Sequence, residues 1–226
     1  MMLKKFAKLA LCLAPAALMA GCATQKAAPF DYSAFKAAKP ASIVVLPPLN
    51  NSPEVVAPYS VLAQVSYPLA EAGYYVLPVA LVDETFKQNG LTTAADIHAV
   101  STAKLRQIFG ADAALYVTVK NYGSTYAVVR SDILVTASAR LVDLKTGTEL
   151  WHGTASASSA EQNNNGGGGL VGALVAAAVK QIIASTTDAS HPIAGVASQR
   201  LLAAGQYNGM LYGPRSSHYA TQSAAQ

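Results

Sequence analysis

Charged side chains are scarce in this chain: only 12% of its 226 residues are Asp, Glu, Lys or Arg, about half of the roughly 25% that is usual in soluble proteins. Cysteine occurs twice and tryptophan once. The low charge and the hydrophobic content of 52% exclude a disordered charged tail. Two cysteines exclude a disulfide-dense scaffold. The length fits one globular domain, at a prior of about 150 residues per domain.

The excess of basic residues belongs to the N-terminus. Residues 1–21 contain Lys4, Lys5 and Lys8, no acidic residue, and an apolar run of about 11 residues over 9–19. This layout predicts a signal peptide, because the run is too short for a membrane span of roughly 20 residues. Without these residues, 13 basic side chains remain against 12 acidic ones. The mature chain is then nearly neutral, which gives no support for nucleic-acid binding.

The apolar run ends in Leu18-Met19-Ala20-Gly21-Cys22. This segment resembles the lipobox of bacterial lipoproteins, in which a peptidase cuts after two small residues and the next Cys thiol carries diacylglycerol. We therefore predict cleavage between Gly21 and Cys22, and acylation of Cys22 with fatty acids such as palmitate as the membrane anchor. Met19 departs from the Leu that is most common there. The alternative is an ordinary secretory signal with an incidental cysteine.

The residue after the lipobox predicts where the anchor goes. In the Gram-negative sorting rule, Asp at this place favours the inner membrane, and the chain has Ala23. We therefore predict an outer-membrane lipoprotein with its domain in the periplasm or at the cell surface. Cys12 leaves with the signal peptide, so the mature chain has no disulfide and no Cys metal ligand.

Composition along the mature chain predicts one folded domain between two extended segments. The aromatic residues Phe30, Tyr32 and Phe35 are unusual in a bare linker and are expected to dock on the domain. The predicted parts are a lipidated Cys and tether over 22–40, a globular domain over 41–205 with a Gly/Asn-rich mobile loop over 158–169, and a flexible or extended tail over 206–226.

Hydrophobic periodicity predicts an α/β (α+β) fold with a mixed sheet of about five strands and helices packed on it. The β-branched run Ile43-Val44-Val45 indicates a buried strand, and the turn over 143–147 joins two strands of a three-stranded antiparallel meander, followed by a C-terminal helix. Pro68 should kink or break its helix. Strands are expected over 42–47, 74–77, 114–120, 126–144 and 148–156, and helices over 58–72, 79–90, 93–109, 170–185 and 193–204.

The glycine run over 166–169 raises the question of a phosphate-binding loop. A Walker loop needs Lys directly after its last glycine, and the next Lys in this chain is Lys180. Gly167, Gly169 and Gly172 fit the start of a dinucleotide fingerprint, but no predicted strand leads into them. We therefore expect no cofactor.

The titratable residues form no catalytic or metal-binding pattern. The four histidines are not spaced at i, i+4, so we expect single surface side chains. Asp83 and Glu84 should point apart at an exposed helix start. No catalytic, cofactor or metal residues are predicted, although an envelope enzyme acting through His152, Asp83 or Glu84 is an alternative. The histidines are His98, His152, His191 and His218.

Small residues recur every four positions at Gly168, Gly172 and Ala176. This spacing allows two helices to approach closely, either in a homo-oligomer or against a membrane partner. The alternative is a core helix that covers the sheet.

Four segments resemble the N-terminal domain of TolB and the periplasmic part of CsgG-type lipoproteins. Over residues 40–205 the chain is similar to a family of Gram-negative lipoproteins of unknown function that are thought to accompany a CsgG-like lipoprotein. The resemblance implies the TolB-like fold and carries no catalytic residue. The segments are Ile43-Val44-Val45-Leu46-Pro47-Pro48, Gly73-Tyr74-Tyr75-Val76-Leu77-Pro78, residues 110–117 and residues 139–151.

Three functions follow from these observations. The first is a non-enzymatic, protein-binding accessory of an outer-membrane export or envelope-assembly system, with a CsgG-like partner. The second is a tethered periplasmic regulator of peptidoglycan synthesis, for which a tether of about 18 residues has a modest reach, near 60 Å at most. The third is an envelope enzyme.

Overall fold

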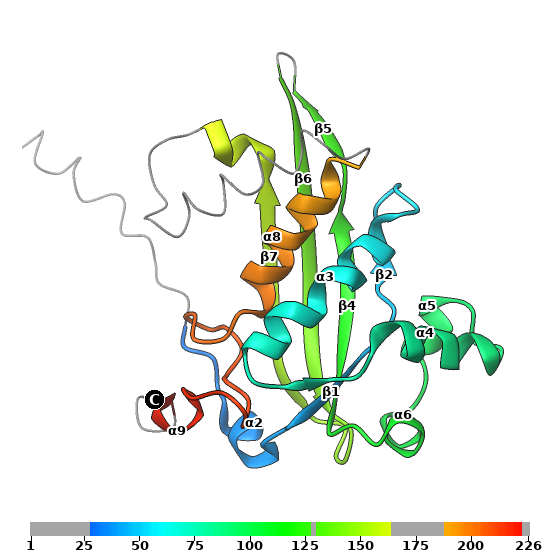
Figure 1. Ribbon diagram of the computed structural model, residues 1–226, viewed down its shortest axis with the longest axis vertical. Coiled ribbons are helices and arrows are strands. Elements are labelled where there is room, and N and C mark those ends of the chain that lie inside the picture. Colours follow the sequence, from blue (N-terminus) through cyan, green and yellow to red (C-terminus); the bar gives the residue numbers. More distant parts are fainter. Residues whose placement is uncertain (1–27, 128–129, 164–187, 223–226) are drawn as a thin grey trace, which may run out of the picture. The chain divides into compact units, whose positions relative to one another are not determined.

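A computed structural model of the chain describes residues 28–127, 130–163 and 188–222. The fold below is that of the unit Asp31–Gln226. Its centre is a mixed sheet with the strand order β3-β1-β4-β6, to which β2 adds beside β4, and β5 and β7 add beside β6 (Figure 1). The strands are β1 (Ser42–Val45), β2 (Leu49–Asn50), β3 (Tyr75–Val76), β4 (Ala113–Asn121), β5 (Ser124–Ala127), β6 (Arg130–Asp143) and β7 (Glu149–Ser158).

The sheet has a parallel and an antiparallel half. β1 pairs in parallel with both β3 and β4. β4, β6 and β7 form the expected antiparallel meander, in which Tyr116, Arg140 and His152 lie side by side. The predicted α/β class, with a mixed sheet and this meander, is confirmed.

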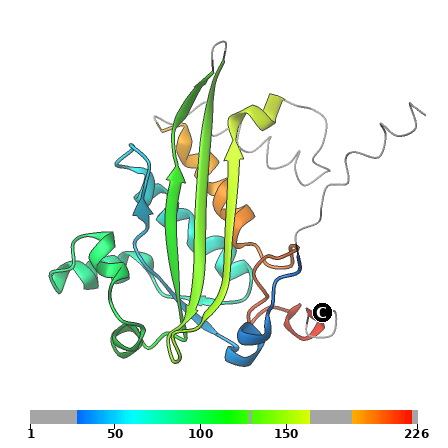
Figure 2. The same cartoon turned by 180° about the vertical axis from the view of Figure 1, so that it is seen from behind.

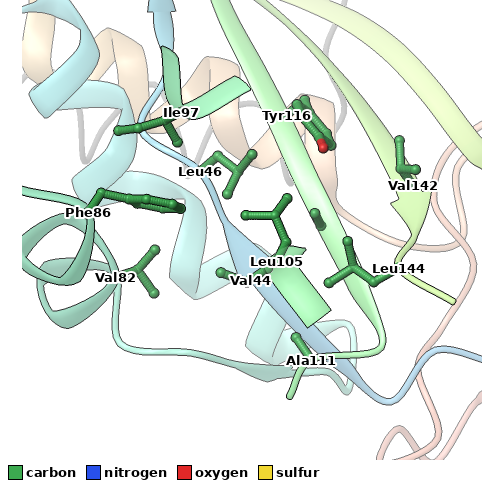
Figure 3. Close-up of a cluster of buried hydrophobic side chains, with 11 residues drawn as sticks. Val44, Leu46, Val82, Phe86, Ile97, Leu105, Ala111, Tyr116, Val142 and Leu144 are labelled. Atoms are coloured by element: carbon green, nitrogen blue, oxygen red, sulfur yellow. The ribbon is translucent and has the colours of Figure 1, made fainter. Parts of the chain in front are cut away.

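Helices cover the sheet on both faces. α3 (Ala57–Glu71) and α8 (Ser190–Leu202) pack against each other, and α8 lies on β6 and β7 (Figure 1). α4 (Val79–Gln88), α5 (Ala94–His98) and α6 (Thr102–Phe109) enclose a second core cluster with β1 and β4 (Figure 3). β1 is therefore buried on both faces, which explains its continuous apolar sequence.

From behind, β4, β6 and β7 lie in front of α3 and α8 (Figure 2). On this side β6 and β7 present polar side chains, with Arg140, His152, Thr154 and Ser156 exposed. The alternate residues of β6, such as Val135 and Leu141, are buried because successive side chains of a strand point to opposite faces. We call Thr154 and Ser156 the open sheet face.

α3 continues through Pro68, which was expected to kink or break it. A proline ring removes one helical hydrogen bond. The side of α3 that carries Val61, Val65 and Leu69 is fully buried, and this packing keeps the helix in one piece.

Both segments expected to be extended carry structure in the described residues. Within the predicted tether, α2 (Ser33–Ala38) forms a helix whose Phe35 is only 4% exposed, as the expected docking requires. Within the predicted tail, Met210 and Leu211 are buried, and α9 covers Tyr219–Gln222. The tail around Met210 and Leu211 is therefore packed on the domain.

Side-chain hydrogen bonds from buried aromatic residues attach the C-terminal segment to the domain. Trp151 Nε1 donates to the carbonyl oxygen of Asn208, and the buried Tyr74 hydroxyl donates to that of Leu211. Burial raises the pKa of Tyr74, so the hydroxyl remains a donor.

Several predictions lie outside the described residues. These are the signal peptide, the cleavage site Gly21–Cys22 with lipidation of Cys22, most of the Gly/Asn-rich loop, the helix over 170–185 and its contact residues Gly168, Gly172 and Ala176.

Candidate functional site

The outer side of α3 carries two exposed tyrosines and ends at the exposed Glu71, one turn after the second tyrosine. Tyr59 and Tyr67 are 60% and 66% exposed, and Val55, just before the helix, is 81% exposed. Residues four apart share one helical face, which also places the exposed Ala63 between the tyrosines. Together with Val56, we call these residues the tyrosine face. No charged residue occurs over 57–70.

This composition is typical of a protein-docking surface. Contiguous exposed apolar side chains mark interaction sites, and interface centres are enriched in Tyr and depleted in charged residues. A tyrosine supplies a large contact area through a side chain with few rotatable bonds, so little entropy is lost on binding.

A polar cluster fixes the inner side of α3 to α8. Ser60 Oγ lies 2.7 Å from His191 Nδ1, and Gln64 Nε2 lies 2.8 Å from His191 Nε2. The Tyr122 hydroxyl lies 2.9 Å from Ser60 Oγ and 2.7 Å from Asp188 Oδ2. We call these five residues the α3–α8 clamp.

The direction of these hydrogen bonds decides what the Ser60–His191 pair can do. With the Gln64 amide as placed, its N–H donates to Nε2, so the ring proton is on Nδ1 and is donated to Ser60. The single proton of Tyr122 goes to the carboxylate of Asp188, the stronger acceptor, and Ser60 donates to Tyr122. An imidazole that donates to a serine does not activate it as a nucleophile.

Burial also fixes the protonation of Tyr122. Burial and the bond to Asp188 raise the pKa of the Tyr122 hydroxyl, because both disfavour the phenolate. The clamp is therefore a partly buried structural network, which holds α3 and its tyrosine face on the domain.

Two of the four histidines are not the surface side chains that we expected. His191 belongs to the clamp. His98 is half-buried: its Nε2 donates to the Pro47 carbonyl at 2.9 Å, and its ring lies edge-on against Tyr116. Burial and the nearby charge of Arg140 lower the pKa of His98, despite the opposing effect of the bond to Pro47.

His152 and His218 are exposed, as expected. His152 Nδ1 lies 2.7 Å from Glu149 Oε1, and the ring of His218 packs near Tyr212. These two residues lie on β7 and in the C-terminal segment, apart from the clamp.

Asp83 and Glu84 accept hydrogen bonds from different residues. Lys87 Nζ donates to Asp83 at 2.6 Å, and Gln88 Nε2 donates to Glu84 at 3.0 Å. Both are contacts one turn along α4, as expected for carboxylates that point apart on an exposed helix.

Within residues 28–127, 130–163 and 188–222, no group of three or more His, Cys, Asp or Glu side chains is placed to hold a metal ion. In the same part of the chain, no helix is both long and apolar enough to cross a membrane.

Comparison with known proteins identifies the family. A family model described as "Putative lipoprotein GNA1162-like" matches residues 30–215. The chain belongs to the GNA1162-like lipoproteins. A relative in Neisseria meningitidis serogroup B (strain MC58), described as "Putative lipoprotein NMB1124/NMB1162", is 54% identical over 207 residues, which are 92% of this chain and 95% of the relative.

A solved structure supports the same assignment. The crystal structure of lipoprotein GNA1162 from Neisseria meningitidis is 57% identical and covers 65% of this chain and all of that one, with a TM-score of 0.52. The predicted lipoprotein family is thus confirmed, and GNA1162-like membership makes the chain a membrane-anchored envelope protein.

Sequence reasoning missed the tyrosine face, although its signal was present. The helix predicted over 58–72 has its buried positions at Val61, Val65 and Leu69, which leaves Tyr59 and Tyr67 on the opposite side. The clamp has no comparable signal, because Ser60 and His191 are 131 positions apart.

Proposed function

We propose that this lipoprotein is a non-enzymatic, protein-binding accessory of an outer-membrane export or envelope-assembly system, with a CsgG-like lipoprotein as its partner. The observation that carries the proposal is the tyrosine face, a helix surface on which Tyr59 and Tyr67 are exposed and no charged residue lies between them. A partner that covers both rings gains their hydrophobic burial.

The proposed function requires the N-terminal lipid anchor. Cleavage after Gly21 and acylation of Cys22 would attach the domain to the outer membrane, as Ala23 predicts. From Cys22 to Ser33, where α2 begins, an extended chain reaches about 40 Å at most. The anchor would therefore hold α2 within this distance of the membrane.

The test compares two double variants of the full-length lipoprotein. Tyr59→Ser/Tyr67→Ser removes both rings of the tyrosine face, and the control Thr154→Ala/Ser156→Ala changes two exposed residues of the open sheet face. Each protein is purified from crosslinked, detergent-solubilised envelopes, and its bound proteins are identified and quantified by mass spectrometry.

We expect the tyrosine variant to lose most of its CsgG-like partner, about 30-fold for a hot-spot loss near 2 kcal/mol. The control should retain it, and thermal melting should show both variants folded. Equal recovery with both variants would refute the tyrosine face as the docking surface. Recovery of a peptidoglycan synthase instead would support the regulatory alternative.

A further inference from the structure

A pocket of about 220 Å³ lies between α2 and the C-terminal segment. Apolar and aromatic side chains form its walls, and two lysines lie among them. The residues that matter here are Phe35, Lys36, Lys39, Leu211, Tyr212 and Tyr219.

Local structure gives this pocket two firm walls. On one side, Phe35 is buried, and Lys39 ends α2 with a φ of 46°, a left-handed cap that turns the chain back toward the sheet. On the other side, the Gln222 side chain accepts from the backbone N–H of Tyr212 and donates to its carbonyl, at 2.6 and 2.8 Å. This pair of bonds holds α9 beside Tyr212.

The charged side chains that line the pocket are both basic. Lys36 and Lys39 are exposed, and neither belongs to the ion pairs found among the described residues, which join Lys87, His152 and Arg200 to carboxylates. Residues 206–222 contain Arg215 and no Asp or Glu.

The acidic side chain nearest to α2 in sequence is hydrogen-bonded to its neighbour Ser33 and keeps its negative charge. Asp31 accepts hydrogen bonds from the backbone N–H and the hydroxyl of Ser33, and these bonds lower its pKa. An anion entering the pocket meets the ammonium groups of Lys36 and Lys39, which belong to none of the ion pairs between described residues.

The position of the pocket in the chain points to the anion. Lys36 follows Cys22 by 14 residues, so on the proposed lipid anchor, on which this inference rests, the lysines remain within about 50 Å of the bilayer even if that stretch is extended. Lysine attracts anionic headgroups, and tyrosine is favoured at the membrane interface. Phe35 and Leu211 offer an apolar wall for a glycerol backbone.

We propose that this pocket binds the phosphate of an anionic phospholipid headgroup in the membrane that carries the anchor. Lys36 and Lys39 hold the phosphate oxygens, and the aromatic side chains cover the glycerol. Such a contact would fix how the domain sits on the membrane, which a single N-terminal lipid anchor cannot do.

The test uses the full-length lipoprotein in neutral detergent micelles. Titration calorimetry measures its affinity for dihexanoyl phosphatidylglycerol, dihexanoyl phosphatidylcholine and inorganic phosphate. The test variant is Lys36→Gln/Lys39→Gln, and the matched control Lys104→Gln/Lys145→Gln removes the same charge from exposed sites on α6 and in the β6–β7 turn.

We expect phosphatidylglycerol to bind at least about tenfold more tightly than phosphatidylcholine, and the Lys36/Lys39 variant to lose this preference while the control keeps it. Equal binding of the two lipids, or an unchanged preference in the Lys36/Lys39 variant, would overturn the proposal. Inorganic phosphate binding as tightly as phosphatidylglycerol would overturn the lipid as its source.

The mass of the N-terminal peptide from the same sample reports acylation of Cys22. A failed anchor is thereby distinguished from a failed pocket, and neither readout depends on the protein partner of the tyrosine face.

Discussion

The tyrosine face and the α2 pocket are both exposed and rich in aromatic side chains, but they differ in charge. Between Tyr59 and Tyr67 the helix has no charged residue and it ends at Glu71, whereas Lys36 and Lys39 flank the pocket. Contacts at the first surface depend on short-range packing, and contacts at the second act over a Debye length of about 10 Å at 0.1 M salt. A lipoprotein that must meet a protein and a membrane at once needs both kinds of surface on different elements.

Gly73→Ala is expected to have the largest effect on the free energy of unfolding, and it acts on the side of the pocket. A Cβ at Gly73 would lie 2.4 Å from the backbone nitrogen of Ser216 and 2.9 Å from the carbonyl oxygen of Gly213, and the residue has a φ of +94°. The C-terminal wall of the pocket must then move. We expect a loss of about 3 kcal/mol or more in the free energy of unfolding, from strain of order 1–3 kcal/mol plus the clash.

The control for this variant is Gly90→Ala, which has a φ of +79° but no atom within 4 Å of the added Cβ. Denaturant unfolding should show a loss of only about 1–2 kcal/mol for the control, since strain acts there alone. Equal losses would mean that the C-terminal segment is not packed on Gly73.

A smaller effect, confined to the region beneath the tyrosine face, is expected from Tyr122→Phe. The change removes the donor to Asp188 Oδ2 and the acceptor of the Ser60 hydroxyl, at a cost of about 1–3 kcal/mol. Partner recovery should fall as α3 loosens, while binding of phosphatidylglycerol to the pocket stays constant. Chemical denaturation and the two binding assays check this.

Tyr59→Phe is the matched control for Tyr122→Phe. It also removes a tyrosine hydroxyl, but from an exposed residue of α3, the helix that the clamp holds. It should leave the free energy of unfolding unchanged within about 0.5 kcal/mol. A destabilisation as large as that of Tyr122→Phe would show that the clamp does not support α3.

The smallest expected effect is the pH dependence of the free energy of unfolding that His98 causes. This residue belongs neither to the tyrosine face nor to the pocket, so its effect should be the same whether or not those regions are changed. Its pKa in the folded state is lowered by burial and by Arg140, so the unfolded chain takes up the proton first as the pH falls below about 6.5. The free energy of unfolding should therefore decrease as the pH falls from 6.5 toward the lowered value, and be unaffected by this group above about pH 7.5.

Thermal melting between pH 5 and pH 8 checks this dependence. His98→Gln should lose this part of the acid-induced decrease, and His152→Gln should keep it, because His98 is still present. If His98→Gln keeps the full decrease, other groups cause it.

The regular elements were predictable because their signals are local. The run Ile43-Val44-Val45 predicts β1, and the turn over 143–147 fixes the β6–β7 hairpin. Pro58 and the spacing of Val61, Val65 and Leu69 predict α3. In each case neighbouring residues carry the whole pattern.

The parts of the fold and of the pocket that could not be predicted depend on contacts between residues distant in sequence. Trp151 donates a hydrogen bond to the Asn208 carbonyl, and Tyr74 donates one to the Leu211 carbonyl. A backbone carbonyl has no sequence signature, so nothing in the Gly-, Ser- and Tyr-rich residues 206–222 shows that they will pack. The pocket shares this origin, because one wall comes from α2 and the other from the C-terminus.

Photo-crosslinking in living cells tests the docking claim most directly. A benzoylphenylalanine in place of Tyr67 puts the probe on the tyrosine face, and one in place of Thr154 puts it on the open sheet face. We predict a single adduct at Tyr67, with a CsgG-like outer-membrane lipoprotein, and none with that protein at Thr154. An adduct only with a second copy of this chain, equal adducts at both positions, or no adduct at Tyr67 would contradict the account.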